Sequence, residues 1–275
     1  MTNILLDCYE IDSLYLQDCL KNYIKPNYSV AVVVFSFRDS EVKSLSDWNR
    51  LYGKKLFKKG KYYDGIVGGF LSYGISEKNI TFINYFTDTK ETAAEKIKQA
   101  DIIYFTGGAP ERMAERIKEF DLTEVLKNHN GIVMGYSAGA VIQLSEYHLS
   151  PDDYYDEFNY YEGLGYLDDF YLEVHYADTE VQNDAIKRVL DERQKTVYAL
   201  ADRKGAIVAI RQKYMPCKSQ NIYSLHRIGR GMVNSRGRCP HLPVIKFNVS
   251  VVFTERRGRR SLLLLYYHLI IKKLL

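Results

Sequence analysis

The segment GIVMGYSAGAVI, residues 131–142, contains the serine best suited to nucleophilic chemistry. An apolar stretch runs into the turn GYSAG, which matches the pattern G-x-S-x-G and precedes a run of small residues that favours a helix start. At such a strand-to-helix turn the serine adopts a strained backbone conformation and its hydroxyl projects from the sheet. The helix N-terminus behind it favours developing negative charge. The pattern predicts Ser137 as a nucleophile; a tight packing turn is the alternative.

A second strand that runs into a turn is predicted at residues 102–110, IIYFTGGAP. Because Gly107 and Gly108 lack side chains, a backbone N–H can point into the crevice beyond the strand ends, where open α/β sheets bind ligands. We expect the N–H of Gly108 and that of Ala138, directly after the serine, to form an oxyanion hole. A plain β-turn is the alternative. Phosphate binding is disfavoured, because neither G-x-G-x-x-G nor G-x-x-x-x-G-K occurs here.

The general base for Ser137 is expected at His175, which follows the strand-like run FYLEV and should emerge at a sheet edge. The other histidines lie in polar or irregular contexts and are interpreted as solvated: His129, His148, His226, His241 and His268. An acid should orient the imidazole and stabilise its cation. The pattern alone does not choose among four carboxylates of the following tyrosine-rich loop, namely Asp152, Asp153, Asp156 and Glu157.

Strand and helix patterns alternate over residues 1–210. Strands are expected at 29–37, 80–86, 102–106, 131–135, 171–175, 196–200 and 206–210. Helices are expected near 11–23, 41–51, 62–73, 91–100, 123–129 and 181–194, with one more beginning at Pro110. This alternation predicts an α/β fold: a three-layer sandwich with a mostly parallel, doubly wound (flavodoxin-like) sheet and helices on both faces.

Charge divides the chain of 275 residues at about Ile210. Residues 211–275 carry 14 Lys or Arg and one acid, whereas the preceding 210 residues carry 24 basic and 33 acidic side chains. The segment 211–275 also lacks a sustained helical or strand period. It is interpreted as an irregular basic extension outside the fold, either disordered or translated out of frame; a nucleic-acid or membrane-binding arm is the alternative. The acidic body, 1–210, is not expected to bind nucleic acid.

The composition favours a cytoplasmic protein with no membrane association. Asp7 and Glu10 interrupt the first apolar stretch, so no secretory signal is expected. The longest uncharged apolar run, 262–271, is about half of what a bilayer-spanning helix needs. The four cysteines, Cys8, Cys19, Cys217 and Cys239, form no C-x-x-C pair and are expected to be reduced thiols. No H-E-x-x-H occurs, so neither a metal nor a cofactor is expected.

Residues 1–210 resemble the serine peptidases of the dipeptidase E (alpha-aspartyl dipeptidase) and cyanophycinase group, which share the fold of class I glutamine amidotransferases. The resemblance is specific at TGGAPERM, at GYSAGAVI and at GLGYLDDFYLEVHY. It implies Ser137 as nucleophile, His175 as base, and Gly108 with Ala138 as the oxyanion hole. It also implies an acid about fifteen residues beyond the nucleophile, which is Asp152, with Asp153 as the second choice.

The resemblance predicts a cofactor-independent serine peptidase of small peptides, including dipeptides with N-terminal Asp. The chain departs from the family at Ala109, where many relatives have Asn, and after Ile210, where relatives usually end in a short strand or hairpin. Glutamine amide hydrolysis is disfavoured, because the amidotransferases of this fold use cysteine where this chain has Ser137. The alternative outside enzymes is a non-catalytic ligand-binding or regulatory module that keeps the fold and its crevice.

Overall fold

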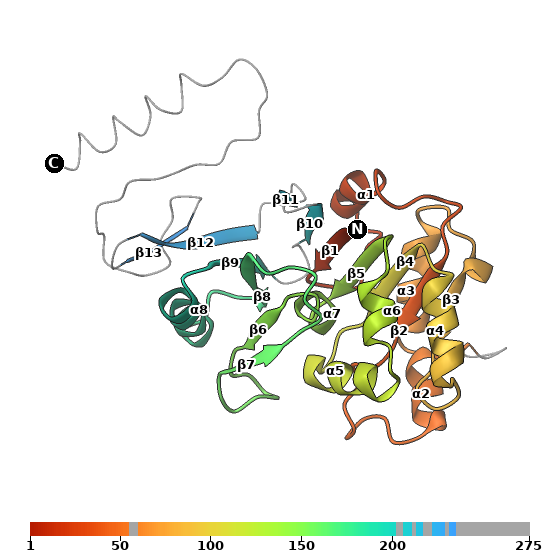
Figure 1. The fold of residues 1–275 in the computed structure, drawn as a ribbon. Coiled ribbons are helices and arrows are strands. Elements are labelled where there is room, and N and C mark those ends of the chain that lie inside the picture. The colour runs from red at the N-terminus through yellow and green to blue at the C-terminus, as the bar shows by residue number, and fades with distance from the viewer. Residues whose placement is uncertain (55–59, 202–205, 211–212, 217–221, 229–230, 235–275) are drawn as a thin grey trace, which may run out of the picture. The chain divides into compact units, whose positions relative to one another are not determined.

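A computed structural model describes residues 1–54, 60–201, 206–210, 213–216, 222–228 and 231–234. Within this described part, seven strands form the main sheet in the order β11-β10-β1-β5-β4-β2-β3 (Figure 1). Their bounds are β1 (Thr2–Leu6), β2 (Val30–Val33), β3 (Ile80–Ile83), β4 (Ile102–Phe105), β5 (Ile132–Tyr136), β10 (Ala206–Ile210) and β11 (Lys213–Pro216). Strands β1 to β5 run parallel, and β10 and β11 add antiparallel pairs at one edge.

Seven helices cover the two faces of the main sheet in the described part. One face carries α1 (Leu14–Leu20), α2 (Leu45–Tyr52) and α3 (Tyr63–Leu71). The other carries α4 (Lys90–Lys98), α5 (Pro110–Glu119), α6 (Thr123–Lys127) and α7 (Ala138–Val141). A 3-10 turn, η1 (Glu77–Asn79), precedes β3. The predicted three-layer α/β sandwich with a mostly parallel sheet is therefore confirmed.

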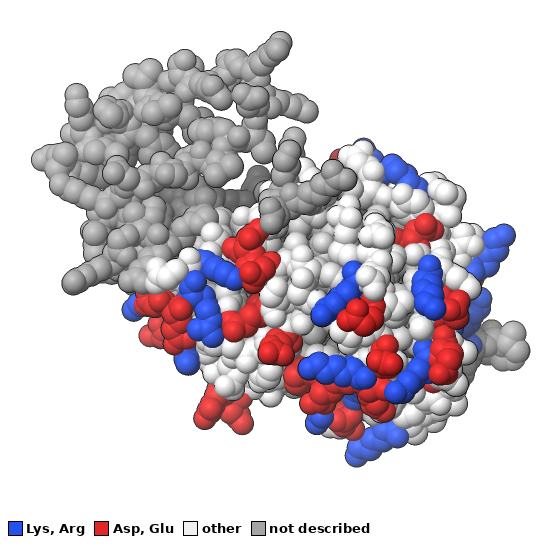
Figure 2. All heavy atoms as spheres, in the orientation of Figure 1, with Lys and Arg blue, Asp and Glu red and all other residues white. Residues whose placement is uncertain are grey.

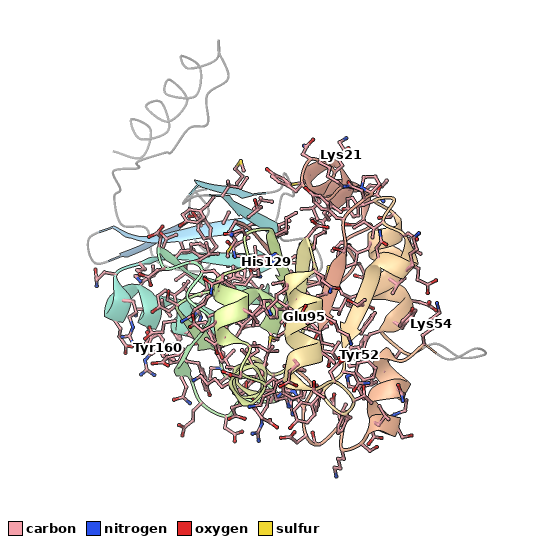
Figure 3. All side chains as sticks on the ribbon, turned by 45° about the vertical axis from the view of Figure 1, so that its right-hand side comes forward. Lys21, Tyr52, Lys54, Glu95, His129 and Tyr160 are labelled. Atoms are coloured by element: carbon pink, nitrogen blue, oxygen red, sulfur yellow. The ribbon has the colours of Figure 1, made fainter. Side chains whose placement is uncertain are left out.

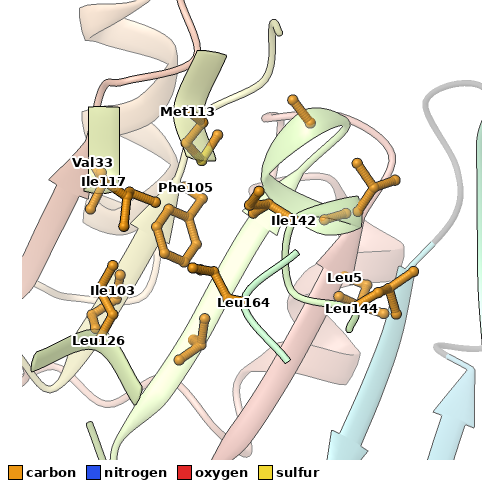
Figure 4. Close-up of a cluster of buried hydrophobic side chains, with 14 of the residues drawn as sticks. Leu5, Val33, Ile103, Phe105, Met113, Ile117, Leu126, Ile142, Leu144 and Leu164 are labelled. Carbon is orange, nitrogen blue, oxygen red and sulfur yellow. The ribbon is translucent and has the colours of Figure 1, made fainter. Parts of the chain in front are cut away.

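Two hydrophobic cores follow from the alternation of side chains along the strands. In β2, Ala31 and Val33 pack with one core, whereas Val30 and Val32 pack with the other. Because the central strands are buried on both faces, they are apolar almost without interruption. Figure 4 shows the first core, where strand residues such as Phe105 meet Met113 of α5.

A second sheet, with the order β13-β12-β9-β8 in the described part, carries the segment of the predicted base. Its strands are β8 (Phe170–Tyr176), β9 (Thr196–Ala201), β12 (Ile222–Ile228) and β13 (Gly231–Asn234), and α8 (Glu180–Arg193) packs on it. A two-stranded hairpin, β6 (Glu146–Leu149) with β7 (Asn159–Glu162), precedes it. The expected strands 171–175 and 196–200 are thus present, but they pair with each other and not with the main sheet.

The chain continues in these sheets beyond Ile210, where the sequence suggested a boundary. Strand β11 pairs with β10, β12 with β9, and β13 with β12. The last described residue, Asn234, therefore still belongs to the second sheet. Short runs with β-forming residues suffice for such strands at or next to a sheet edge, even between basic residues. The rest of the expected extension, 235–275, lies outside the described residues.

None of the helices in the described part of the chain is long and apolar enough to cross a membrane. The cysteine expectation holds only in part, because Cys8 is a free thiol and Cys19 is disulfide-bonded. Cys217 and Cys239 lie outside the described residues.

Candidate active site

Ser137 occupies a strained turn between β5 and α7. Its φ is 51° and its ψ is −115°, a combination that non-glycine residues rarely adopt. Its main-chain N–H donates to the carbonyl of Leu6, 2.9 Å away, which ties the turn to the end of β1. The turn also lies close to β4, since a Cβ at Gly139 would be 2.2 Å from the carbonyl oxygen of Phe105. The predicted strand, turn and helix around Ser137 are all present.

His175 lies beside this serine at a bulge near the end of β8. Its Nε2 is 2.9 Å from the Ser137 Oγ, although the two residues are 38 positions apart in sequence. The pairing between β8 and β9 shifts register between Glu173 and Tyr176, and the φ of His175 is 53°. A bulge of this kind turns a side chain away from the regular direction of its strand. About half of the imidazole, 49%, is exposed to solvent.

Among the described residues, the carboxylate of Asp7 lies against the imidazole. Its Oδ1 accepts the main-chain N–H of His175 at 2.7 Å and lies 3.4 Å from the imidazole Nδ1. Strands β1 and β5 are parallel with Leu6 opposite Tyr136, so the next residues, Asp7 and Ser137, emerge together at the carboxyl ends. The Asp7 side chain is completely buried. Sequence reasoning missed this residue, although a lone acid directly after an apolar strand was a readable signal.

Asp152, the acid expected from the resemblance, has other partners. Its carboxylate accepts the main-chain N–H groups of Tyr154 and Tyr155 at 2.7 and 3.0 Å, which forms a local turn. Asp152 and its neighbour Asp153 are both exposed. The structure therefore brings Ser137 and His175 together as expected, with Asp7 and not Asp152 against the imidazole.

Two main-chain N–H groups are available for an oxyanion near Ser137. Those of Gly108 and Ala138 have no acceptor among the described residues. Gly108 has a φ of 138°, and a Cβ there would lie 2.2 Å from the carbonyl oxygen of Ser36. Only glycine fits this close approach. The neighbouring N–H of Ala109 is already donated to that carbonyl, at 2.7 Å.

All these groups line one cavity of about 820 Å³. Its wall comes from the ends of β1, β4 and β5, from the segment after β2, from the loop after β6 and from β8. Aromatic rings supply much of the remaining surface: Tyr9, Phe37, Tyr52, Tyr62, Tyr136, Tyr154 and Tyr155. A serine hydroxyl, an imidazole and two N–H donors that meet in such a cavity can support acyl transfer to the serine.

The comparisons with known proteins identify the family. The model of peptidase family S51 matches residues 56–214, more than half of the chain. The chain belongs to peptidase family S51. It is therefore a serine peptidase.

Two solved structures are similar to this S51 peptidase, and the first has the same fold. A candidate peptidase E protein from Listeria monocytogenes EGD-e is similar with a TM-score of 0.55 and 17% identity, over 78% of this chain and 96% of that one. A peptidase from an acI-B1 Actinobacterium is similar with a TM-score of 0.49 and 14% identity, over 84% and 93% of the two chains. No curated protein matches the chain.

Two histidines of the S51 peptidase that were interpreted as solvated are not. The His148 side chain is completely buried in the cavity wall, and its Nε2 lies 2.7 Å from Oε2 of Glu173, which also accepts from the Ser150 hydroxyl. His129 is half-buried, and burial lowers its pKa. His129 precedes β5 and so lies at the amino ends of the strands, away from the Ser137 cavity. That cavity, to which Tyr52 belongs, lies at the carboxyl ends (Figure 3). Tertiary packing, which a single sequence does not reveal, buries these two rings.

Proposed function

We propose that this S51 peptidase hydrolyses small peptides through a serine nucleophile, Ser137, with His175 as general base. The observation that carries the proposal is the 2.9 Å separation of Ser137 Oγ and His175 Nε2 at a strained strand-to-helix turn. His175 takes the hydroxyl proton as the Ser137 oxygen attacks the scissile carbonyl. The tetrahedral oxyanion accepts from the N–H groups of Gly108 and Ala138. The imidazolium then protonates the leaving amine, and water repeats the cycle on the acyl-enzyme.

We assign Asp7, in place of Asp152, as the acid that stabilises the imidazolium. A buried negative charge 3.4 Å from Nδ1 favours the protonated ring, which forms during proton transfer. Through the hydrogen bond to the His175 main chain, the same carboxylate also fixes the residue that carries the ring. Asp152 shapes the loop wall of the cavity by its turn and takes no part in proton transfer.

Substrates are short peptides, because the nucleophile stands inside a cavity of about 820 Å³ and not on an open surface. Dipeptides are the first class to test, including those with N-terminal Asp that the family resemblance suggests. A non-catalytic module is disfavoured, since it would not require a serine and an imidazole at 2.9 Å. Glutamine amide hydrolysis is disfavoured by the serine at position 137, and ammonia release from glutamine would detect it.

The test is the Ser137→Ala variant against a dipeptide library and a serine-directed fluorophosphonate probe. We expect loss of hydrolysis and of labelling, with an unchanged circular dichroism spectrum. Ser76→Ala is the matched control, because Ser76 is exposed and its side chain makes no capping hydrogen bond. Undiminished labelling of Ser137→Ala would reject the nucleophile assignment.

A further inference from the structure

The cavity of the proposed active site contains one Lys or Arg side chain among its described lining residues, that of Arg38. Four of its five acidic lining residues have evident roles or an exposed position. Asp7 contacts His175, Glu173 contacts His148, Asp152 forms its turn, and Glu41 is exposed. Arg38, by contrast, lies half-buried in the wall. A half-buried guanidinium is costly to desolvate unless an anion accompanies it.

Arg38 has no ion pair among the described residues, unlike the other arginines whose side chains are described. These five, Arg50, Arg112, Arg116, Arg188 and Arg193, all pair with carboxylates. Asp39, the nearest acid in sequence, is occupied by Arg112 and Arg116. Figure 2 shows how closely basic and acidic side chains are interspersed over the helices on the face that it draws. The charge of Arg38 is therefore left for something that enters the cavity.

Aromatic rings hold this guanidinium in place. Its Cζ lies 3.8 Å from the centroid of the Tyr154 ring and 5.3 Å from that of Tyr155. Both tyrosines follow the Asp152 turn, and the Tyr155 hydroxyl donates to Glu111 at the start of α5. A guanidinium stacked in this way loses less side-chain entropy when a ligand binds. One hydrogen bond joins it to the Tyr155 side chain, and its remaining N–H groups suit the fork geometry of a carboxylate.

The backbone connects Arg38 to the oxyanion side of the cavity. Arg38 stands two residues after Ser36, whose carbonyl accepts the Ala109 N–H and lies against Gly108. A carboxylate held by Arg38 would therefore fix a peptide relative to the N–H groups of Gly108 and Ala138. This is what a specificity subsite requires.

We propose that Arg38 binds a carboxylate of the peptide substrate and thereby selects it. This inference rests on the proposed peptidase function. The carboxylate is either the C-terminal one or that of an acidic side chain on the N-terminal residue. Both sources present the same carboxylate group to Arg38. A C-terminal amide removes the first, and Asn in place of Asp removes the second.

The test measures kcat/KM of wild type, Arg38→Met and Arg38→Lys on Asp-Leu, Asn-Leu, Asp-Leu amide and Asn-Leu amide. Methionine keeps the length of the stem and removes the charge. For substrates with the bound carboxylate, we expect Arg38→Met to lower kcat/KM on the order of 10- to 100-fold. The substrates without it should change less than about threefold, and Arg38→Lys should recover part of the loss. Arg188→Met is the control, since Arg188 stacks on Phe158 outside the cavity lining and pairs with Glu192.

If Arg38→Met lowers kcat/KM only for the two peptides with a free C-terminus, Arg38 binds the terminal carboxylate. If it lowers kcat/KM only for the two peptides with N-terminal Asp, Arg38 binds the side-chain carboxylate. Either result supports the proposal. A loss equal for all four peptides, or no loss for any, overturns it.

Calorimetry separates this proposal from that of hydrolysis. The same four peptides are titrated into Ser137→Ala and into the double variant with Arg38→Met. The dissociation constant should rise 10- to 100-fold, again only for peptides with the bound carboxylate. If wild type cleaves none of the peptides, the proposed function fails while this binding difference can still be found. Absence of binding by all four overturns the Arg38 subsite.

Discussion

Asp7 accepts the main-chain N–H of His175 at 2.7 Å, and this contact joins the carboxyl end of β1 to the end of β8. The two residues are 168 positions apart and belong to different sheets. The hydrogen bond therefore connects the main sheet, which carries Ser137, to the second sheet, which carries the imidazole. The two side chains that meet at 2.9 Å, those of Ser137 and His175, thus come from the two parts of the fold that this bond joins.

We expect Asp7→Asn to lower kcat by about 10²- to 10⁴-fold, with KM changed much less. The amide oxygen can still accept the His175 N–H, but the charge that stabilises the imidazolium is lost. Steady-state kinetics on the best dipeptide, together with circular dichroism, measure this effect.

Asp152→Asn is the matched control for Asp7→Asn. An asparagine oxygen can accept the same N–H groups of Tyr154 and Tyr155, so activity should stay within about twofold of wild type. If Asp152→Asn loses more activity than Asp7→Asn, the assignment of the acid returns to the loop.

The serine turn and the glycine turn could be predicted because their sequence patterns are local. Ser137 and Gly108 each follow a continuous apolar strand, and parallel strands bring their carboxyl ends to one edge. His175 could be predicted as the end of a strand-like run. Its positive φ and its bulge could not, because they depend on the pairing of β8 with β9.

Asp7, which we propose as the acid, could not be found in this way, because the first strand was not recognised. The residues NILLD were interpreted only as a stretch too interrupted for a secretory signal. As β1, they place Asp7 at the carboxyl edge beside Ser137. The division into two sheets was equally hidden, since a strand pattern does not reveal its pairing partner. The hairpin of β6 and β7 was also missed, because its polar and aromatic residues resemble a loop.

Gly108→Ala should destabilise the fold by about 2–5 kcal/mol and abolish hydrolysis. The φ of 138° is disfavoured for alanine, and its Cβ would stand 2.2 Å from the Ser36 carbonyl oxygen. Urea unfolding followed by circular dichroism gives the free energy. Gly68→Ala is the control. Gly68 lies inside α3 with no heavy atom within 4 Å of the new Cβ, so the free energy of unfolding should rise by about 0.5–1 kcal/mol. Equal stability of the two variants would contradict the close approach at Gly108.

Arg116→Met should destabilise the protein by about 2–4 kcal/mol. The guanidinium of Arg116 is buried and donates to the carbonyls of Phe35 and Phe37 at 2.6 and 2.7 Å. Methionine keeps the apolar stem but leaves both carbonyls without this donor. Those carbonyls flank Ser36, whose own carbonyl positions the Gly108 turn. We therefore also expect a lower kcat, because the Gly108 N–H would be held less firmly.

Arg112→Met is the control for Arg116→Met. Arg112 belongs to the same helix and contacts the same Asp39, but 46% of its side chain is exposed. The loss of an exposed ion pair should cost less than about 1 kcal/mol. A comparable loss of stability in both variants would show that the carbonyl contacts of Arg116 contribute little.

Cys8 should remain unreactive toward thiol reagents at neutral pH, although it lines the cavity next to Asp7. Burial raises the pKa of the Cys8 thiol to about 12, and the nearby charges of Asp7 and Glu10 raise it further, while a hydrogen bond from the Glu10 main chain opposes the shift. At pH 8, only about one Cys8 in 10⁴ would be a thiolate, the form that reacts. Iodoacetamide at pH 8 should therefore leave hydrolysis unchanged under conditions in which a fluorophosphonate abolishes it.

Peptide mapping by mass spectrometry after that treatment locates the alkylated cysteines. Alkylation of Cys8 should be minor at pH 8 and should increase as the pH rises toward 12, because the thiolate population grows about tenfold for each pH unit below the pKa. Alkylation increases with pH because the raised pKa of Cys8 keeps the proton on most of the sulfur atoms at any pH below that pKa. Rapid, stoichiometric alkylation of Cys8 at pH 8, with parallel loss of hydrolysis, would mean that a thiolate and not the Ser137 hydroxyl is the reactive nucleophile of this cavity.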